Sequence, residues 1–174
     1  AADLALEDYK PGDKLVPYKV VGEYKGTDLM GMEYEQLLPW VKPVSIDENG
    51  QWKDASAQAF RVIPGDYVTT EDGTGIVHIA PTFGADDAKV ARLAGVPGLQ
   101  VVDRNGDLQA QVDLRGRFFR VEDLDPEYAA ANMSPEYAEW AGRYVKNAYD
   151  ATLDADAPTL DVDICVMLKQ QNKA

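Results

Sequence analysis

Runs of β-branched and aromatic residues, separated by turn signals, recur along most of the chain and predict many short strands. Residues 17–38 predict a hairpin around a Lys25-Gly-Thr27 turn. Arg104-Asn-Gly-Asp107 contains the Asn-Gly pair that is favoured in tight hairpins. The other expected strands cover residues 60–63, 67–70, 76–80, 99–103, 108–112 and 162–168, and more sheet is expected up to Val121.

Residues 39–59 interrupt this pattern. Pro39 and Pro43 bracket Trp40, and Asp47-Glu-Asn-Gly50 is a turn signal, so we expect an irregular or inserted excursion here. Trp40 itself is expected to lie in the core, because a large aromatic side chain gains more from burial than from exposure.

Three helices are expected among and after these strands. One follows a turn at Gly84 and ends at Gly95. Asp125-Pro126 and Ser134-Pro135 each combine a capping residue with a first-position proline, which marks two further helix starts. The last helix carries an apolar stripe at three- and four-residue spacing, which predicts packing against a core: Tyr137, Trp140, Ala141, Tyr144, Val145 and Ala148.

Many short strands and a few helices, in no regular alternation, predict an α+β domain. We expect a barrel-like or strongly bent, mostly antiparallel sheet with peripheral helices; a doubly wound parallel sheet is the alternative. Residues 1–9 favour a short helix, followed by a turn at Lys10-Pro-Gly-Asp13. Because the chain opens on Ala1 and stops at Ala174, residues 1–174 are interpreted as a single domain cut from a larger protein.

Charge and cysteine content limit the possible partners. The chain has 17 basic and 30 acidic residues, a net charge of −13, and its positive residues form no stripe, so independent nucleic-acid binding is expected to be weak or absent. Cys165 lies in an apolar run and is expected to be a buried thiol. The lack of a disulfide framework favours a reducing, cytoplasmic location, and no apolar run of about 18 residues suggests a membrane partner.

The stretch from Gly73 to Asp87 combines glycines, a histidine and two carboxylates. Its two first glycines, Gly73 and Gly75, permit a backbone geometry or a close approach that a side chain would prevent. Both faces of the expected strand at 76–80 are largely apolar, so we expect it to be interior. His78, the single histidine, is then either a satisfied core residue or a side chain that reaches a cleft.

Several chemistries do not fit this stretch. There is no second His or Cys nearby to complete a metal site, and no serine in an elbow-like context to form a triad. A dinucleotide-binding loop is also excluded, because His78 stands where the Gly-x-Gly-x-x-Gly motif requires its third glycine. Asp86 and Asp87 suit the positive end of the expected helix, so they are either capping carboxylates or a fixed anion beside His78.

The sequence Gly73-Thr-Gly-Ile-Val-His-Ile-Ala-Pro81, followed by Phe83-Gly-Ala-Asp-Asp87, resembles the signature of isoleucyl-tRNA synthetase editing domains. Residues 22–43 and 144–164 resemble the same family, so the likeness covers nearly the whole chain. His78 and Phe83-Gly84 favour the isoleucyl type. At the position of His78, the valyl type usually has Lys and the leucyl type usually has an apolar residue. The resemblance implies the barrel-like fold that the three types share.

The resemblance also implies roles for residues. Asp87 matches the acid that holds the substrate ammonium, and His78 matches the residue that shapes the pocket, with Thr74, Gly75 and Ala80 also binding substrate; Asp86 would be the structural carboxylate. The implied activity is hydrolysis of mischarged valyl-tRNA(Ile). The partner is the aminoacylated 3′ end of tRNA(Ile), bound by a monomeric parent enzyme that uses ATP and Mg; the domain itself needs no cofactor or metal.

One departure from the family's pattern concerns a threonine-rich Thr-Thr-x-Pro-Trp-Thr segment, which forms the other wall of the family's pocket and is absent from this sequence. Thr69-Thr70 lacks the Pro-Trp context. We therefore expect an incomplete site, with weak or no activity in this chain alone. A non-catalytic inserted or interaction module, and an editing domain of the valyl or leucyl type, stay open. A cleft shared by His78 and Asp87 would favour editing, and a buried His78 would not.

Overall fold

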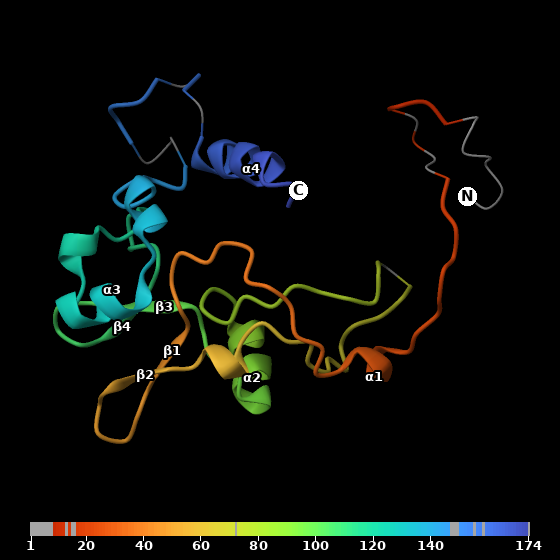
Figure 1. Cartoon of the computed structure of the whole chain (residues 1–174), viewed down its shortest axis with the longest axis horizontal. Coiled ribbons are helices and arrows are strands. Elements are labelled where there is room, and N and C mark those ends of the chain that lie inside the picture. Colours follow the sequence, from red (N-terminus) through yellow and green to blue (C-terminus); the bar gives the residue numbers. More distant parts are fainter. Residues whose placement is uncertain are drawn as a thin grey trace.

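A computed structural model describes residues 9–12, 14, 17–71, 73–146, 150–154, 156–157 and 159–173 (Figure 1). Its helices are α1 (Gly26–Leu29), α2 (Ala85–Ala94), α3 (Pro126–Asn132) and α4 (Leu160–Gln170), with 3-10 turns η2 (Ser56–Gln58), η3 (Val121–Asp123) and η4 (Pro135–Glu139). Its strands are β1 (Val44–Ile46), β2 (Trp52–Asp54), β3 (Gln100–Val102) and β4 (Leu108–Ala110). The helix predicted at residues 1–9 falls almost entirely outside the described residues.

The strands form two antiparallel hairpins, β1–β2 and β3–β4. This confirms a mixed α+β fold, but the described residues contain no closed barrel and no strongly bent sheet. Isolated bridges such as Val41 with Met133 and Arg117 with Tyr144 join other parts of the chain. The predicted barrel is therefore not formed by the described part of the chain, because most of the expected strands have no neighbour with which to pair.

Within the excursion predicted at residues 39–59, residues 44–54 form an ordered hairpin around the turn that Asp47-Glu-Asn-Gly50 predicted. The Asp47 carboxylate accepts hydrogen bonds from the Asn49 and Gln51 amides, each at 2.9 Å, and this closes the turn between β1 and β2. The β3–β4 turn was predicted correctly. It uses Gly106 at φ +86°, a conformation that favours glycine.

Two of the predicted helices are confirmed and one is shorter than expected. Helix α2 begins after Gly84 and ends at Gly95, whose φ is +69°. Helix α3 is capped by Asp125, which accepts a hydrogen bond from the Tyr128 amide at 2.7 Å. The helix predicted from Pro135 is the 3-10 turn η4, and the chain turns away at Gly142 (φ +77°). Ala148, the last residue of the predicted stripe, lies outside the described residues.

The strand predicted at residues 162–168 is the helix α4. Leu160 and Leu168 are buried on one face, and Ile164 packs against the core from the same face, which is a four-residue spacing. Val162 and Val166, which alternation would place with them, are about half exposed. Cys165 is exposed, so the prediction of a buried thiol was also wrong. A short apolar run can fit both the two-residue period of a strand and the 3.6-residue period of a helix, and packing against the rest of the chain decides which of the two forms.

The core is built around stacked indole rings. Trp40 and Trp140 lie with ring centroids 4.9 Å apart, which confirms Trp40 as a core residue. Two fully buried tyrosines connect the core to backbone: the Tyr128 hydroxyl donates to the Gln100 carbonyl, and the Tyr137 hydroxyl to the Phe119 carbonyl. Burial raises the pKa of both hydroxyls far above the usual value for tyrosine. This core joins β1, β3, α3, η4 and α4.

The N-terminal arm lies outside this core, on the side of the molecule away from α3 (Figure 1). The hairpin predicted at 17–38 is absent from it: residues 17–25 are extended and have no partner strand in the described part of the chain, and α1 follows. The turn at Pro11-Gly12 is present. The strands predicted at 67–70 and 76–80 are not formed. Residues 60–62 pair with residues 31–34 through an isolated antiparallel bridge between Glu33 and Arg61 and through three flanking backbone hydrogen bonds. No helix among the described residues is long and apolar enough to span a membrane.

Candidate functional site

The glycines at the start of the candidate segment adopt the backbone that the sequence predicted. Gly73 has a φ of +140° and Gly75 a φ of +76°. A Cβ added to Gly75 would lie 3.0 Å from the Thr70 methyl group. Between them, the Thr74 hydroxyl accepts from the Ile76 amide at 3.3 Å and lies 3.0 Å from the Ile76 carbonyl. This compact loop fixes the direction in which the chain enters residues 76–80.

Residues 76–80 are extended but do not form the interior strand that we expected. Ile76 is 63% exposed and Val77 48% exposed, and His78 is exposed as well. Of the two alternatives left open for His78, the satisfied core residue is therefore not the one observed. The cause is the absence of a neighbouring strand among the described residues, which leaves both apolar faces of the segment uncovered. His78 is accessible to a ligand.

Asp87 ties this segment to the start of α2. Its Oδ2 atom accepts a hydrogen bond from the Ala80 amide at 3.0 Å. The Ala80 carbonyl in turn accepts from the Phe83 and Gly84 amides, at 3.0 and 3.1 Å. A Cβ added to Gly84 would lie only 2.7 Å from Asp87 Oδ2. A glycine at 84 therefore makes room for the carboxylate at the positive end of the helix.

The structural role that was predicted for Asp86 falls to Asp87. Asp86 is exposed and its carboxylate forms no hydrogen bond with the described residues, whereas Asp87 is half-buried and its carboxylate is bonded. The Oδ1 atom of Asp87 has no hydrogen-bond partner in the described part of the chain, so it is available to a ligand. Sequence spacing could not separate the two carboxylates, because both lie in the first turn of α2.

The predicted site residues are only partly brought together. Ala80 and Asp87 are in direct contact, while no hydrogen bond joins Thr74, Gly75 or His78 to Asp87. A groove of about 590 Å³ beside α2 is lined by the neighbouring residues Pro81, Thr82 and Ala88, and by Arg92. Neither His78 nor Asp87 lines it. This groove is therefore not the shared cleft of His78 and Asp87 that would favour editing.

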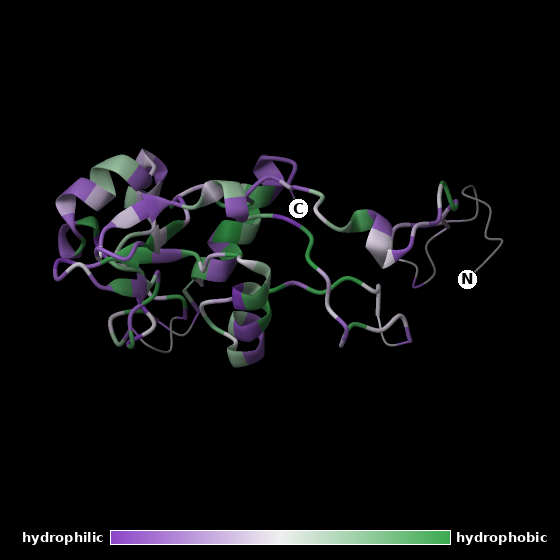
Figure 2. Cartoon of the chain, turned by 90° about the horizontal axis from the view of Figure 1, so that it is seen from below, coloured by the Kyte–Doolittle hydropathy of each residue, from purple (hydrophilic) through white to green (hydrophobic). Residues whose placement is uncertain are grey.

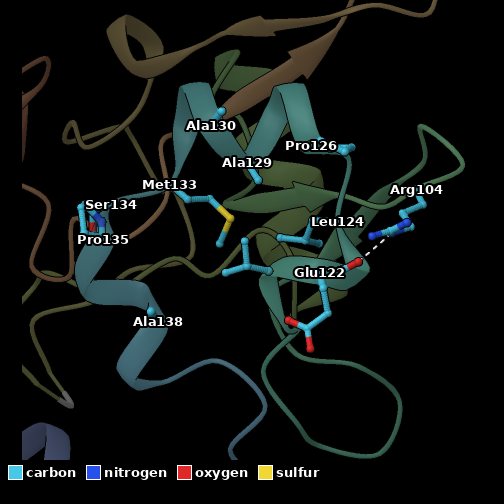
Figure 3. A pocket seen from close by; sticks show the side chains of 11 residues that line it. Arg104, Glu122, Leu124, Pro126, Ala129, Ala130, Met133, Ser134, Pro135 and Ala138 are labelled. Atoms are coloured by element: carbon cyan, nitrogen blue, oxygen red, sulfur yellow. Dashed lines mark hydrogen bonds between the residues drawn. The ribbon is translucent and has the colours of Figure 1, made fainter.

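A second hollow, of about 530 Å³, lies between α3 and η4 and was not anticipated from the sequence (Figure 3). Leu124 and Met133 point into it. At its edge, the Arg104 side chain donates a hydrogen bond to the Glu122 carbonyl at 2.6 Å. Most of its lining is apolar, and it is remote in sequence from His78 and Asp87. The described residues contain no cluster of His, Cys, Asp and Glu side chains that could hold a metal ion.

Comparison with known proteins decides the family. The chain is 56% identical over its whole length to the isoleucine–tRNA ligase of Bacteroides thetaiotaomicron. It is 57% identical over its whole length to that of Bacteroides fragilis, and 55% identical over 95% of its length to that of Porphyromonas gingivalis. The chain belongs to the isoleucine–tRNA ligases. It spans 14–16% of the length of these ligases.

Membership of the isoleucine–tRNA ligases confirms the resemblance carried by residues 73–87 and makes this chain part of an aminoacyl-tRNA synthetase. The identity extends through the exposed arm and the core alike, since the B. thetaiotaomicron ligase matches 100% of the chain. The valyl and leucyl types are therefore not supported. No protein-family model and no solved structure matches the chain.

Proposed function

We propose that this chain is the editing domain of an isoleucine–tRNA ligase and that it hydrolyses the ester of valyl-tRNA(Ile). The observation that carries the proposal is the placement of Asp87. Its carboxylate is anchored through one oxygen by the Ala80 amide and leaves the other oxygen unpaired, next to a motif that resembles the editing signature. Family membership supports the parent enzyme.

Hydrolysis of an aminoacyl ester requires no covalent nucleophile from the protein, only groups that position the reactants and stabilise charge. Hydrolysis of an aminoacyl ester needs an ordered water, a fixed substrate ammonium and hydrogen-bond donors near the developing oxyanion. Asp87 is the group that would bind the α-ammonium, because a half-buried carboxylate attracts a cation more strongly than an exposed one. His78 would contact the amino-acid side chain from the exposed segment above it. Thr74, Gly75 and Ala80 would complete this wall.

The need for such a site follows from the limits of binding. A pocket that accepts isoleucine cannot strongly reject valine, which is smaller by one methylene, and isoleucyl-tRNA synthetases are themselves the standard example of this limit. A second site that hydrolyses the smaller product removes the error.

The proposed site needs parts that the described residues do not provide. Neither His78 nor Asp87 lines the groove beside α2, and the net charge of −13 opposes tight binding of the tRNA backbone by this chain alone. The rest of the ligase would supply the tRNA contacts and the ATP and Mg chemistry of aminoacylation, whereas hydrolysis by this domain requires no cofactor. We therefore expect the 174-residue chain to deacylate valyl-tRNA(Ile) weakly or not at all.

The test is deacylation of preformed valyl-tRNA(Ile) by full-length ligase. Asp87→Ala is expected to lower the rate by about a hundredfold or more, since it removes a charge that acts on the substrate. Asp86→Ala, one residue away and exposed, is the matched control and is expected to keep the wild-type rate. Equal rates for Asp87→Ala and wild type would end the proposal.

One observation favours a second candidate, in which Asp87 supports the fold and does not bind the substrate. The Asp87–Ala80 hydrogen bond by itself gives Asp87 a purely structural role. Asp87→Asn separates the two, because the amide oxygen still accepts from Ala80 while the negative charge is lost. A deacylation rate that survives Asp87→Asn but falls with Asp87→Ala would support the structural role.

A further inference from the structure

The extended segment at residues 18–24 exposes a regular apolar face. Tyr18 is 67% exposed, Val20 61% and Tyr24 75%. In an extended chain these three side chains lie on one side, and Lys19, Val21 and Glu23 lie on the other. Val21 is 93% exposed, so the second side is polar apart from one valine. Such a pattern is typical of a strand with one buried face. The described residues leave the side with Tyr18, Val20 and Tyr24 largely uncovered.

The backbone of the same segment is also unpaired. No amide or carbonyl of residues 18–24 forms a hydrogen bond with any described residue; the first bond in this region joins Lys25 to Asp28. Figure 2 shows the N-terminal arm reaching away from the packed helices, with hydrophobic positions along it. Unpaired polar backbone beside apolar side chains is what a free strand edge offers to a further strand.

We propose that residues 18–24 pair as a β-strand with a strand from the part of the ligase polypeptide outside these 174 residues. The match covers 14–16% of the length of the relatives, so 84–86% of each relative lies outside the matched part and is joined to that part by the same polypeptide. A second copy of this chain fits less well, since it would bring another net charge of −13 to the contact. Tyr and Val, with their high strand propensity, suit this pairing.

This inference rests on family membership and on the exposed face, and not on the editing reaction. Pairing of residues 18–24 and hydrolysis at Asp87 are separate properties, so either can fail while the other holds.

The test is amide hydrogen exchange in full-length ligase, with a free peptide of residues 17–25 as the reference. Pairing predicts that the amides of residues 18–24 exchange about a hundredfold more slowly than those of the peptide, because paired strands exchange only on opening. Exchange at the rate of the peptide would overturn the proposal. So would protection that is lost on dilution, because that result identifies a second copy as the partner.

Two substitutions to the same residue test the apolar face. Val20→Asp is expected to reduce the protection at least tenfold, and Lys19→Asp, on the opposite side, to leave it within about twofold. Unchanged exchange in β3 and β4 shows that the fold is intact. Protection that is lost equally in both variants, or in neither, would contradict a buried apolar face.

The partner strand is located by crosslinking. A photoreactive amino acid at position 20 of full-length ligase is expected to give adducts with peptides outside the 174 residues. Adducts confined to peptides within this chain would show that the segment pairs internally, which contradicts the proposal.

Discussion

Asp87 depends for its position on a neighbour that has no side chain. The carboxylate occupies the space where a Cβ of residue 84 would lie, and its hydrogen bond to the Ala80 amide closes the turn before α2. The motif from Gly73 to Asp87 could be recognised from the sequence, as could the need for glycine at positions 73 and 75. The exposure of His78 could not, because burial depends on which other segments lie beside it.

Gly84→Ala tests the position of Asp87 without changing its chemistry. The backbone of Gly84, at φ −111° and ψ 130°, accepts alanine, but the new Cβ would lie 2.7 Å from Asp87 Oδ2 and displace it. We expect deacylation of valyl-tRNA(Ile) by the full-length ligase to fall by about tenfold to a hundredfold. Gly26→Ala, where a Cβ meets nothing within 4 Å, is the control. Equal rates in the two variants would show that the carboxylate need not stay in place.

At the scale of elements, structure that depends on local signals could be predicted from the sequence better than structure that depends on packing. Caps and turns were predicted well, as Asp125 before α3 and Asn105-Gly106 between β3 and β4 show, because their hydrogen bonds are made within a few residues. Strands were predicted poorly, since a strand exists only where another strand pairs with it. The alternation at residues 162–168 misled for a related reason: the same residues also fit a helix that packs through Leu160 and Leu168.

Asp125→Ala tests the cap of α3. The substitution removes the acceptor of the Tyr128 amide, and we expect it to lower the free energy of unfolding of the chain by about 1 kcal/mol. Glu127→Ala, in the same first turn but exposed, is expected to change it by less than about 0.5 kcal/mol. Urea unfolding followed by circular dichroism measures both. Similar values for the two variants would mean that the cap contributes little.

The β1–β2 turn predicts a pH dependence. The hydrogen bond from Lys53, together with those from the turn amides, lowers the pKa of Asp47 from 3.8 to about 2. A lowered folded-state pKa stabilises the folded chain above the unfolded value, and the contribution is lost as the pH falls from about 4 to about 2. Asp47→Asn is expected to flatten this part of the curve of urea midpoint against pH. Glu48→Gln, in the same turn, is expected to leave it unchanged.

At the scale of the whole molecule, one part of the chain has a core and another does not. Trp40, Trp140 and the two buried tyrosines hold the hairpins and α3 together, while residues 17–37 and 76–83 expose apolar side chains. His78 lies in the part without a core. The fold class and the core tryptophan could be predicted from the sequence. The predicted closed sheet is not formed by the described residues, because its strands lack partners among them.

Trp140→Ala tests where stability resides. The indole is buried and stacked on Trp40, so its loss is expected to lower the free energy of unfolding by about 3–5 kcal/mol. Tyr67→Ala removes an aromatic ring that is 54% exposed, and we expect a change of less than about 1 kcal/mol. Denaturant unfolding of the two variants compares these losses. A small effect at Trp140 would contradict a single core centred on the stacked indoles.

The most direct test of the account is whether full-length ligase with Asp87→Asn accumulates valyl-tRNA(Ile) when supplied with valine, ATP and tRNA. The variant keeps an acceptor for the Ala80 amide and loses only the charge, so we expect valyl-tRNA(Ile) to accumulate while isoleucyl-tRNA(Ile) forms at the wild-type rate. Wild type and Asp86→Asn should accumulate none. If Asp87→Asn accumulates no more valyl-tRNA(Ile) than wild type, the Asp87 charge does not serve editing and the central claim is wrong.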